Sequence, residues 1–164
     1  MGIFSFLFGG NLKAQSDNNT DADNRELYDL TKEQIQFINK NAETGHQFLM
    51  KYSAFNEQKK FEFKYLDEAL VNWKKSNEFA KEKPEKVIGF LGAVFGNKIV
   101  EELNFEWKII TDQYGTDYCV INENGQKNML IAFPFSSAEK SVYENRPDSF
   151  VKIYQYLVKE LNKN

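Results

Sequence analysis

The chain has 164 residues, 41% of them hydrophobic and 27% charged, the composition of a globular domain large enough to bury its own core. The formal net charge is −3, and residues 31–164 are neutral, with 19 acidic and 19 basic side chains. A neutral body without a broad basic face argues against nucleic-acid binding. One cysteine and one histidine leave no intramolecular disulfide, no cysteine-based zinc cluster and no histidine-based metal site, so we expect no cofactor or metal.

The chain opens with an apolar N-terminal segment, residues 3–8, which a polar, turn-rich linker follows from Gly9 to Asn24. The segment is too short to span a bilayer, and it lacks the basic start and cleavage site of a signal peptide. Three roles stay open for it: a loose tail, a segment that docks on its own domain, or a weak peripheral contact with a membrane. We divide the chain into residues 1–26 and a single domain of residues 27–164. The apolar side chains of the segment are Ile3, Phe4, Phe6, Leu7 and Phe8.

Three helices are expected in the first part of the domain. Thr31 and Gln34 have the spacing of a capping box, and apolar residues follow at helical spacing as far as Tyr52. A second apolar stripe predicts a helix over about 61–79. A third helix is expected over 84–103, with a proline in its first turn.

The apolar period then changes from 3.6 to 2. Alternating side chains predict a strand over 105–111, and short turns separate it from two further strands over 116–121 and 127–133. Short turns favour antiparallel pairing. A short helix is expected to begin near residue 136, and an amphipathic helix over 146–164 closes the chain. The predicted fold class is therefore α+β, with N-terminal helices and a C-terminal helix packed on a three-stranded antiparallel meander.

The third predicted helix carries three glycines. Gly89, Gly92 and Gly96 share one narrow stripe with Ala93, since residues three and four apart lie on one side of a helix. Their spacing is not that of a phosphate-binding loop, and amides inside a helix are already paired. Each glycine costs about 1 kcal/mol relative to alanine in a helix interior. We predict that the stripe lets a large ring or another backbone pack closely, and a ligand in this groove is the alternative.

The stretches "LGAVFGNKIVEELNFEW", "DQYGTDYCVI" and "AFPFSS" resemble a small bacterial family known only as a domain of unknown function. Members of that family have an L-G-x-x-x-G helix, a tryptophan on the next strand and a strand that ends in a Pro-Phe pair. The resemblance covers about residues 60–155. It implies the fold and no activity, because the family has no established activity. The matching positions are Leu91, Gly92, Gly96, Trp107, Gly115, Pro134 and Phe135.

No arrangement of residues in the sequence indicates catalysis. His46 has no nucleophile that the sequence places beside it, so we expect a half-buried structural histidine. Cys119 falls inside a predicted strand and is expected to behave as a small hydrophobic residue. Asp67 and Glu68 are neighbours on a helix, point apart, and are expected on a solvated edge. We therefore do not expect an enzyme.

The stretch 101–117 is locally acidic, with five carboxylates against Lys108. Two of them fall in the last turn of the third helix, where the helix dipole disfavours negative charge. A solubilising face is one explanation. We predict instead a non-enzymatic bacterial protein-binding module in the cytoplasm, toxin-neutralising (immunity-like) or an adaptor, whose partner has a basic surface. The alternative is a small-molecule or lipid-binding domain that contacts the inner membrane through the N-terminal segment. The predicted partner-binding residues are Glu101, Glu102, Trp107, Asp112, Tyr114 and Asp117.

Overall fold

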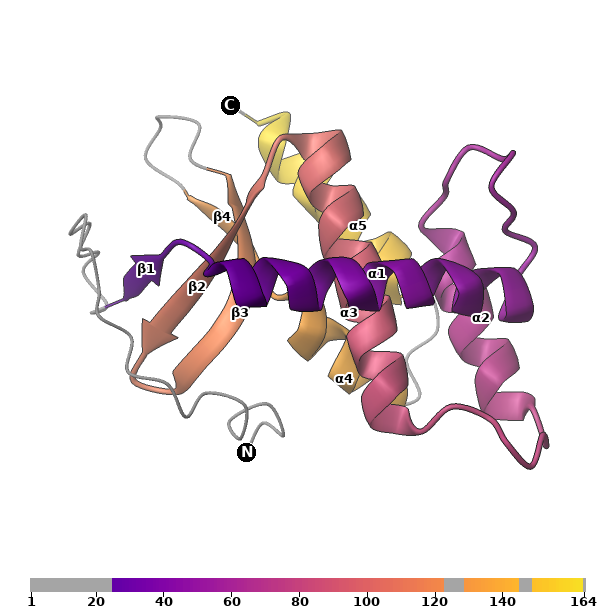
Figure 1. The fold of residues 1–164 in the computed structure, drawn as a ribbon. Helices are drawn as coiled ribbons and strands as arrows, with labels where there is room; N and C mark the ends of the chain where they lie inside the picture. The colour runs from indigo at the N-terminus through magenta and orange to yellow at the C-terminus, as the bar shows by residue number, and fades with distance from the viewer. Residues whose placement is uncertain (1–24, 123–128, 145–148, 164) are drawn as a thin grey trace.

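The fold is α+β, as the sequence predicted, in a computed structural model that describes residues 25–122, 129–144 and 149–163. Figure 1 shows the sheet at one end of the molecule and α2 at the other, with α1 and α3 crossing between them. The apolar N-terminal segment and most of the linker lie outside the described residues. The elements in chain order are β1 (Glu26–Tyr28), α1 (Lys32–Tyr52), α2 (Lys64–Lys75), α3 (Pro84–Leu103), β2 (Glu106–Asp112), β3 (Gly115–Asn122), β4 (Leu130–Ala132), α4 (Pro134–Tyr143) and α5 (Ser149–Leu161).

The described strands form one antiparallel sheet in the order β1-β2-β3-β4. The expected meander corresponds to β2, β3 and β4. The fourth strand, β1, was not predicted, and it crosses the boundary drawn between residues 26 and 27. Three residues are too few to show an alternating pattern, so only pairing with β2, which places Tyr28 opposite Ile109, identifies this strand.

The two longest helices, α1 and α3, have the bounds that the sequence predicted. Thr31 and Gln34 form the expected capping box at the start of α1. The helix α2 is shorter than the predicted range of 61–79. Phe63 stands as its N-cap and Ser76 as its C-cap, so the residues outside these caps are not helical. Propensity and periodicity locate a helix better than they locate its ends.

The glycine stripe of α3 is a packing surface, as predicted. A Cβ on Gly92 would lie 2.5 Å from Cδ1 of Phe135, and a Cβ on Gly96 would overlap the indole of Trp107. Gly45 of α1 likewise allows α1 to pack closely on α3, because a Cβ on Gly45 would lie 2.6 Å from Cγ2 of Val94. The groove is filled by side chains of the protein itself, which contradicts the alternative of a ligand lying in it.

Asp67 is buried, so the prediction of a solvated helix edge was wrong. Its two carboxylate oxygens accept hydrogen bonds from the backbone N–H groups of Phe150 (3.2 Å) and Val151 (3.1 Å). These amides are in the first turn of α5, where N–H groups have no partner within the helix and the helix dipole attracts a negative charge. Asp67 therefore caps α5 from α2. The sequence contained no signal for this contact between residues more than 80 positions apart.

Candidate functional site

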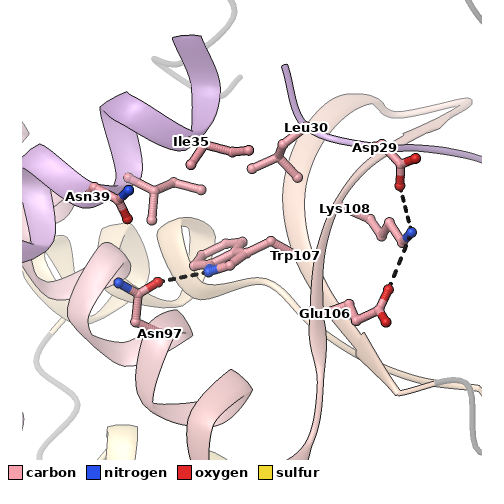
Figure 2. Close-up of a pocket in the computed structure, with 9 residues that line it drawn as sticks. Asp29, Leu30, Ile35, Asn39, Asn97, Glu106, Trp107 and Lys108 are labelled. Atoms are coloured by element: carbon pink, nitrogen blue, oxygen red, sulfur yellow. Dashed lines mark hydrogen bonds and ion pairs between the residues drawn. The ribbon is translucent and has the colours of Figure 1, made fainter. Parts of the chain in front are cut away.

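A pocket of about 350 Å³ opens between the first half of α1, the last third of α3 and the start of β2. It lies where β1 has ended and the chain crosses from the sheet to α1, which leaves the edge of β2 uncovered at residues 106–108. Figure 2 shows the side chains around it. The pocket is lined by Asp29, Leu30, Ile35, Ile38, Asn39, Asn97, Glu106, Trp107 and Lys108.

Trp107 forms a rigid wall of this pocket. One side of its ring packs on Gly96, and its Nε1–H donates a hydrogen bond of 2.9 Å to Oδ1 of Asn97. Figure 2 shows this bond between the strand and the helix. Across the pocket, Leu30 and Ile35 present aliphatic side chains, and Ile35 remains 46% exposed. A fixed ring facing an exposed aliphatic side chain can hold an apolar group.

The rim of the pocket is charged. Lys108 Nζ lies 2.7 Å from Oδ1 of Asp29 and 3.4 Å from Oε2 of Glu106. The hydrogen bond to Asp29 raises the pKa of Lys108, so the lysine is a cation at neutral pH. Both carboxylates are exposed, and these three side chains carry a net charge of −1. The rim can therefore attract a cation while the wall receives an apolar group.

Glu101 and Glu102 lie at the end of α3, as predicted, and both are engaged in contacts. Glu101 Oε2 lies 2.5 Å from Nζ of Lys98, and Glu102 Oε2 accepts a hydrogen bond of 2.9 Å from the hydroxyl of Tyr154. These contacts offset the unfavourable position at the helix C-terminus. Glu101 lies one helical turn after Asn97, which lines the pocket, but Glu101 is not itself among the lining residues.

Asp112, Tyr114 and Asp117 lie at the opposite end of β2, around the turn into β3. A strand of the length of β2 spans about 20 Å, so the six predicted residues form two groups rather than one surface. Tyr114 is 89% exposed, and its N–H donates a 2.7 Å hydrogen bond to Asp112 Oδ1. Asp117 is half-buried, accepts a 2.5 Å hydrogen bond from Oγ of Ser136, and has a pKa raised by burial. Binding of a partner by either group stays a prediction.

The sequence indicated Trp107 and the acidic residues near it but not the pocket. From the sequence, Ile35 and Ile38 belong to the apolar stripe of a helix that faces the core. Glu106 and Lys108 belong to the solvent-exposed face of a strand. Asn97 had no distinguishing feature at all. The pocket is made of three elements that are separate in the sequence, so no spacing within one segment could have indicated it.

His46 and Cys119 lie in different parts of the fold. His46 packs against the ring of Phe55, and its pKa is lowered by burial and by Lys98, so its imidazole is neutral at pH 7. Burial raises the pKa of Cys119 to about 12, as expected for a small buried residue. Within the described ranges, no group of three or more His, Cys, Asp or Glu side chains could hold a metal ion.

The fold and the pocket define a small α+β domain with a pocket of about 350 Å³ on its surface. Residues 67–154 match the model of a domain of unknown function, DUF3806, and the chain belongs to this family. The match runs from α2 into α5 and includes Trp107 and Asn97, but not the wall that α1 supplies. The expected resemblance to a domain of unknown function is confirmed, and the seven motif positions stay a prediction.

One solved structure is similar to this chain in fold. It is a crystal structure from Bacteroides thetaiotaomicron VPI-5482, with a TM-score of 0.58 and 16% sequence identity. The alignment covers 83% of this chain and 48% of that chain, so this chain spans about half its length. No curated protein matches the sequence. Among the helices that the structure describes, none is long and apolar enough to cross a membrane.

Proposed function

We propose that the protein is a non-enzymatic protein-binding module and that its pocket receives an apolar side chain of a partner with a basic surface. The observation that carries this proposal is the arrangement of Trp107. Its indole is fixed by Asn97 and Gly96, and it faces Ile35 inside a pocket with an acidic rim. In protein interfaces, the residues that contribute most of the binding energy are often aromatic and lie in well-packed pockets. A pocket walled by a fixed aromatic ring fits such a role.

The charges support a basic partner. Asp29 and Glu106 stand at the rim, so a Lys or Arg flanking the inserted side chain would meet carboxylates. Glu101 lies one helical turn after the lining residue Asn97 on α3. Such exposed charges act mainly on the association rate and on the choice of partner. The second acidic group, Asp112 and Asp117 with the exposed Tyr114, is a separate contact for a large partner. Toxin-neutralising and adaptor roles in the cytoplasm both fit a domain of this kind.

The test begins with the partner captured by the wild-type protein and identified by mass spectrometry. Its affinity is then measured by calorimetry for the E101K/E106K variant. We expect a loss of at least tenfold. The control variant, E43K/E57K, makes the same charge change at exposed positions of α1 and the following loop and should bind as the wild type does. Unchanged binding by E101K/E106K, with loss in a D112K/Y114A variant, would place the interface at the β2–β3 turn and contradict the proposal.

A small-molecule ligand in the same pocket is the second candidate function. The volume of about 350 Å³ lies in the range of ligand sites, and its wall is apolar with a few polar groups. Native mass spectrometry of the purified protein distinguishes the two. A bound mass that is present in the wild type and lost in an Ile35→Asp variant would favour the ligand over the protein partner.

A further inference from the structure

The face of the sheet that points away from the helices carries its own apolar cluster, which we call the far-face cluster. Side chains alternate along β2 and β3, so Ile109, Tyr118 and Val120 enter the main core while their neighbours face the other way. The cluster consists of Leu27, Ile110, Cys119, Ile121, Met129, Ile131 and Phe133. Its central members, Ile110, Cys119 and Ile121, are each at most 2% exposed.

No described helix contributes a side chain to the far-face cluster. Its members come from the four strands and from the residues that flank β4. The helices that contact the sheet, α1, α3 and α4, pack on its other face, where Trp107 and Phe135 meet. A sheet with water on one face normally carries polar side chains there. In this sheet, polar side chains such as Glu106 and Asp112 lie toward the ends of β2, and the middle of the far face is apolar. Apolar side chains on both faces are typical of a sheet that is covered on both, so we infer a segment or partner that covers the far-face cluster.

We propose that the far-face cluster is the docking site of the apolar N-terminal segment of this chain, residues 3–8. Its side chains Ile3, Phe4, Phe6, Leu7 and Phe8 match the apolar character of the face. The described part of the chain also begins beside this cluster. Arg25 alone separates residue 24 from β1, the edge strand whose Leu27 belongs to the cluster.

The linker has the length that docking requires. Sixteen residues, 9–24, separate the segment from the start of the described chain. A flexible linker of this length has a root-mean-square span of about 20–24 Å, close to the roughly 20 Å length of β2. A tether that matches the distance keeps the segment near its site at an effective concentration in the millimolar range.

A second copy of the chain fits the face less well. Stable interfaces use about 20–30 residues from each partner, and the far-face cluster has seven. A six-residue segment with five apolar side chains matches a cluster of this size. Docking of this segment also needs no second molecule, because the segment belongs to the same chain.

Cys119 provides the test, because it is the single cysteine of the sequence and lies in the middle of the cluster. Its rate of reaction with a soluble thiol reagent is measured in the full chain at pH 8 and 25 °C. In an F4D/F6D/F8D variant we expect the rate to rise at least tenfold, because charged side chains would leave the apolar face. An N11D/N18D/N19D variant adds the same charge to the same part of the chain, keeps the apolar side chains, and should react as slowly as the wild type. An unchanged rate in F4D/F6D/F8D would overturn the proposal.

A second measurement avoids variants that could destabilise the fold. Phe6 is replaced in the full chain by the photo-cross-linking residue p-benzoylphenylalanine, which keeps an aromatic side chain at that position. Irradiation at micromolar concentration should join residue 6 to the peptide that contains Met129 and Ile131 of the same molecule. Cross-linked dimers, or cross-links only to lipid when vesicles are added, would show a second copy or a membrane as the partner of the segment and would contradict the proposal.

Discussion

The ring of Trp107 lies directly on Gly96, and it occupies the space that a Cβ at this position would need. The pair joins β2 to α3 and fixes the wall of the pocket. We predict that Gly96→Ala destabilises the protein by about 1–3 kcal/mol, the usual cost of overpacking, although alanine favours the helix. Urea denaturation followed by circular dichroism measures this difference.

A double-mutant cycle checks the cause. In a Trp107→Phe background, the smaller ring lacks the atoms that would overlap, so Gly96→Ala should cost clearly less there than in the wild type. Equal costs in both backgrounds would mean that the methyl group is not opposed by this ring.

The hydrogen bond between Trp107 and Asn97 leads to a second prediction. Asn97→Ala should destabilise the protein by about 1–2 kcal/mol, because the indole N–H would lose its partner in a half-buried site. Asn97→Asp keeps an oxygen acceptor at the same position and should retain most of the stability. Thermal unfolding of the three proteins compares them. Tryptophan fluorescence in a Trp73→Phe background, where Trp107 is the single tryptophan, reports whether the ring moves. If Asn97→Asp were as destabilised as Asn97→Ala, the hydrogen bond would not be the reason.

The cap that Asp67 places on α5 leads to a third prediction. Asp67→Ala should cost about 1–3 kcal/mol, since one buried amide, one partly buried amide and a helix N-terminus lose a negative partner. Glu68→Ala, the neighbouring carboxylate, serves as the control and should change stability by less than about 0.5 kcal/mol. Hydrogen exchange of the amides of Phe150 and Val151 provides the local measurement. Exchange that stays slow in Asp67→Ala would contradict the role of this carboxylate as a cap.

The buried thiol and phenol of β3 lead to a fourth prediction, for alkaline pH. Burial raises the pKa of Cys119 from 9.0 to about 12 and that of Tyr118 from 10.0 to about 12. The folded state therefore holds these protons more tightly than the unfolded state. Stability should be unaffected below about pH 9 and should fall as the pH rises toward 12, because only the unfolded chain releases the protons.

Urea midpoints measured between pH 7 and pH 11 test this dependence. The Cys119→Ala variant should show a weaker decline between pH 9 and pH 10, where the thiol titrates in the unfolded chain before the phenol does. A decline of the same size in the variant would assign the alkaline transition to other groups.

Local patterns in the sequence determined most of the elements. The capping box at Thr31, the proline that opens α3, and the alternation along β2 and β3 act over a few residues, so they can be read without the fold. The glycine stripe also predicted a close approach correctly, because three glycines on one side of a helix cost stability unless a neighbour packs on them. The sequence did not indicate which residues pack on the glycines, namely Phe135 and Trp107.

Tertiary structure alone decided the features that join distant residues. The strand β1 forms because β2 has a free edge to pair with. Asp67 is a cap because the N-terminus of α5 packs beside α2. The pocket is assembled from α1, α3 and β2, and the predicted acidic surface is divided because one strand separates its two halves by about 20 Å. Contacts of this kind depend on how helices and strands are placed in space, and that placement is fixed by the packing of the whole core.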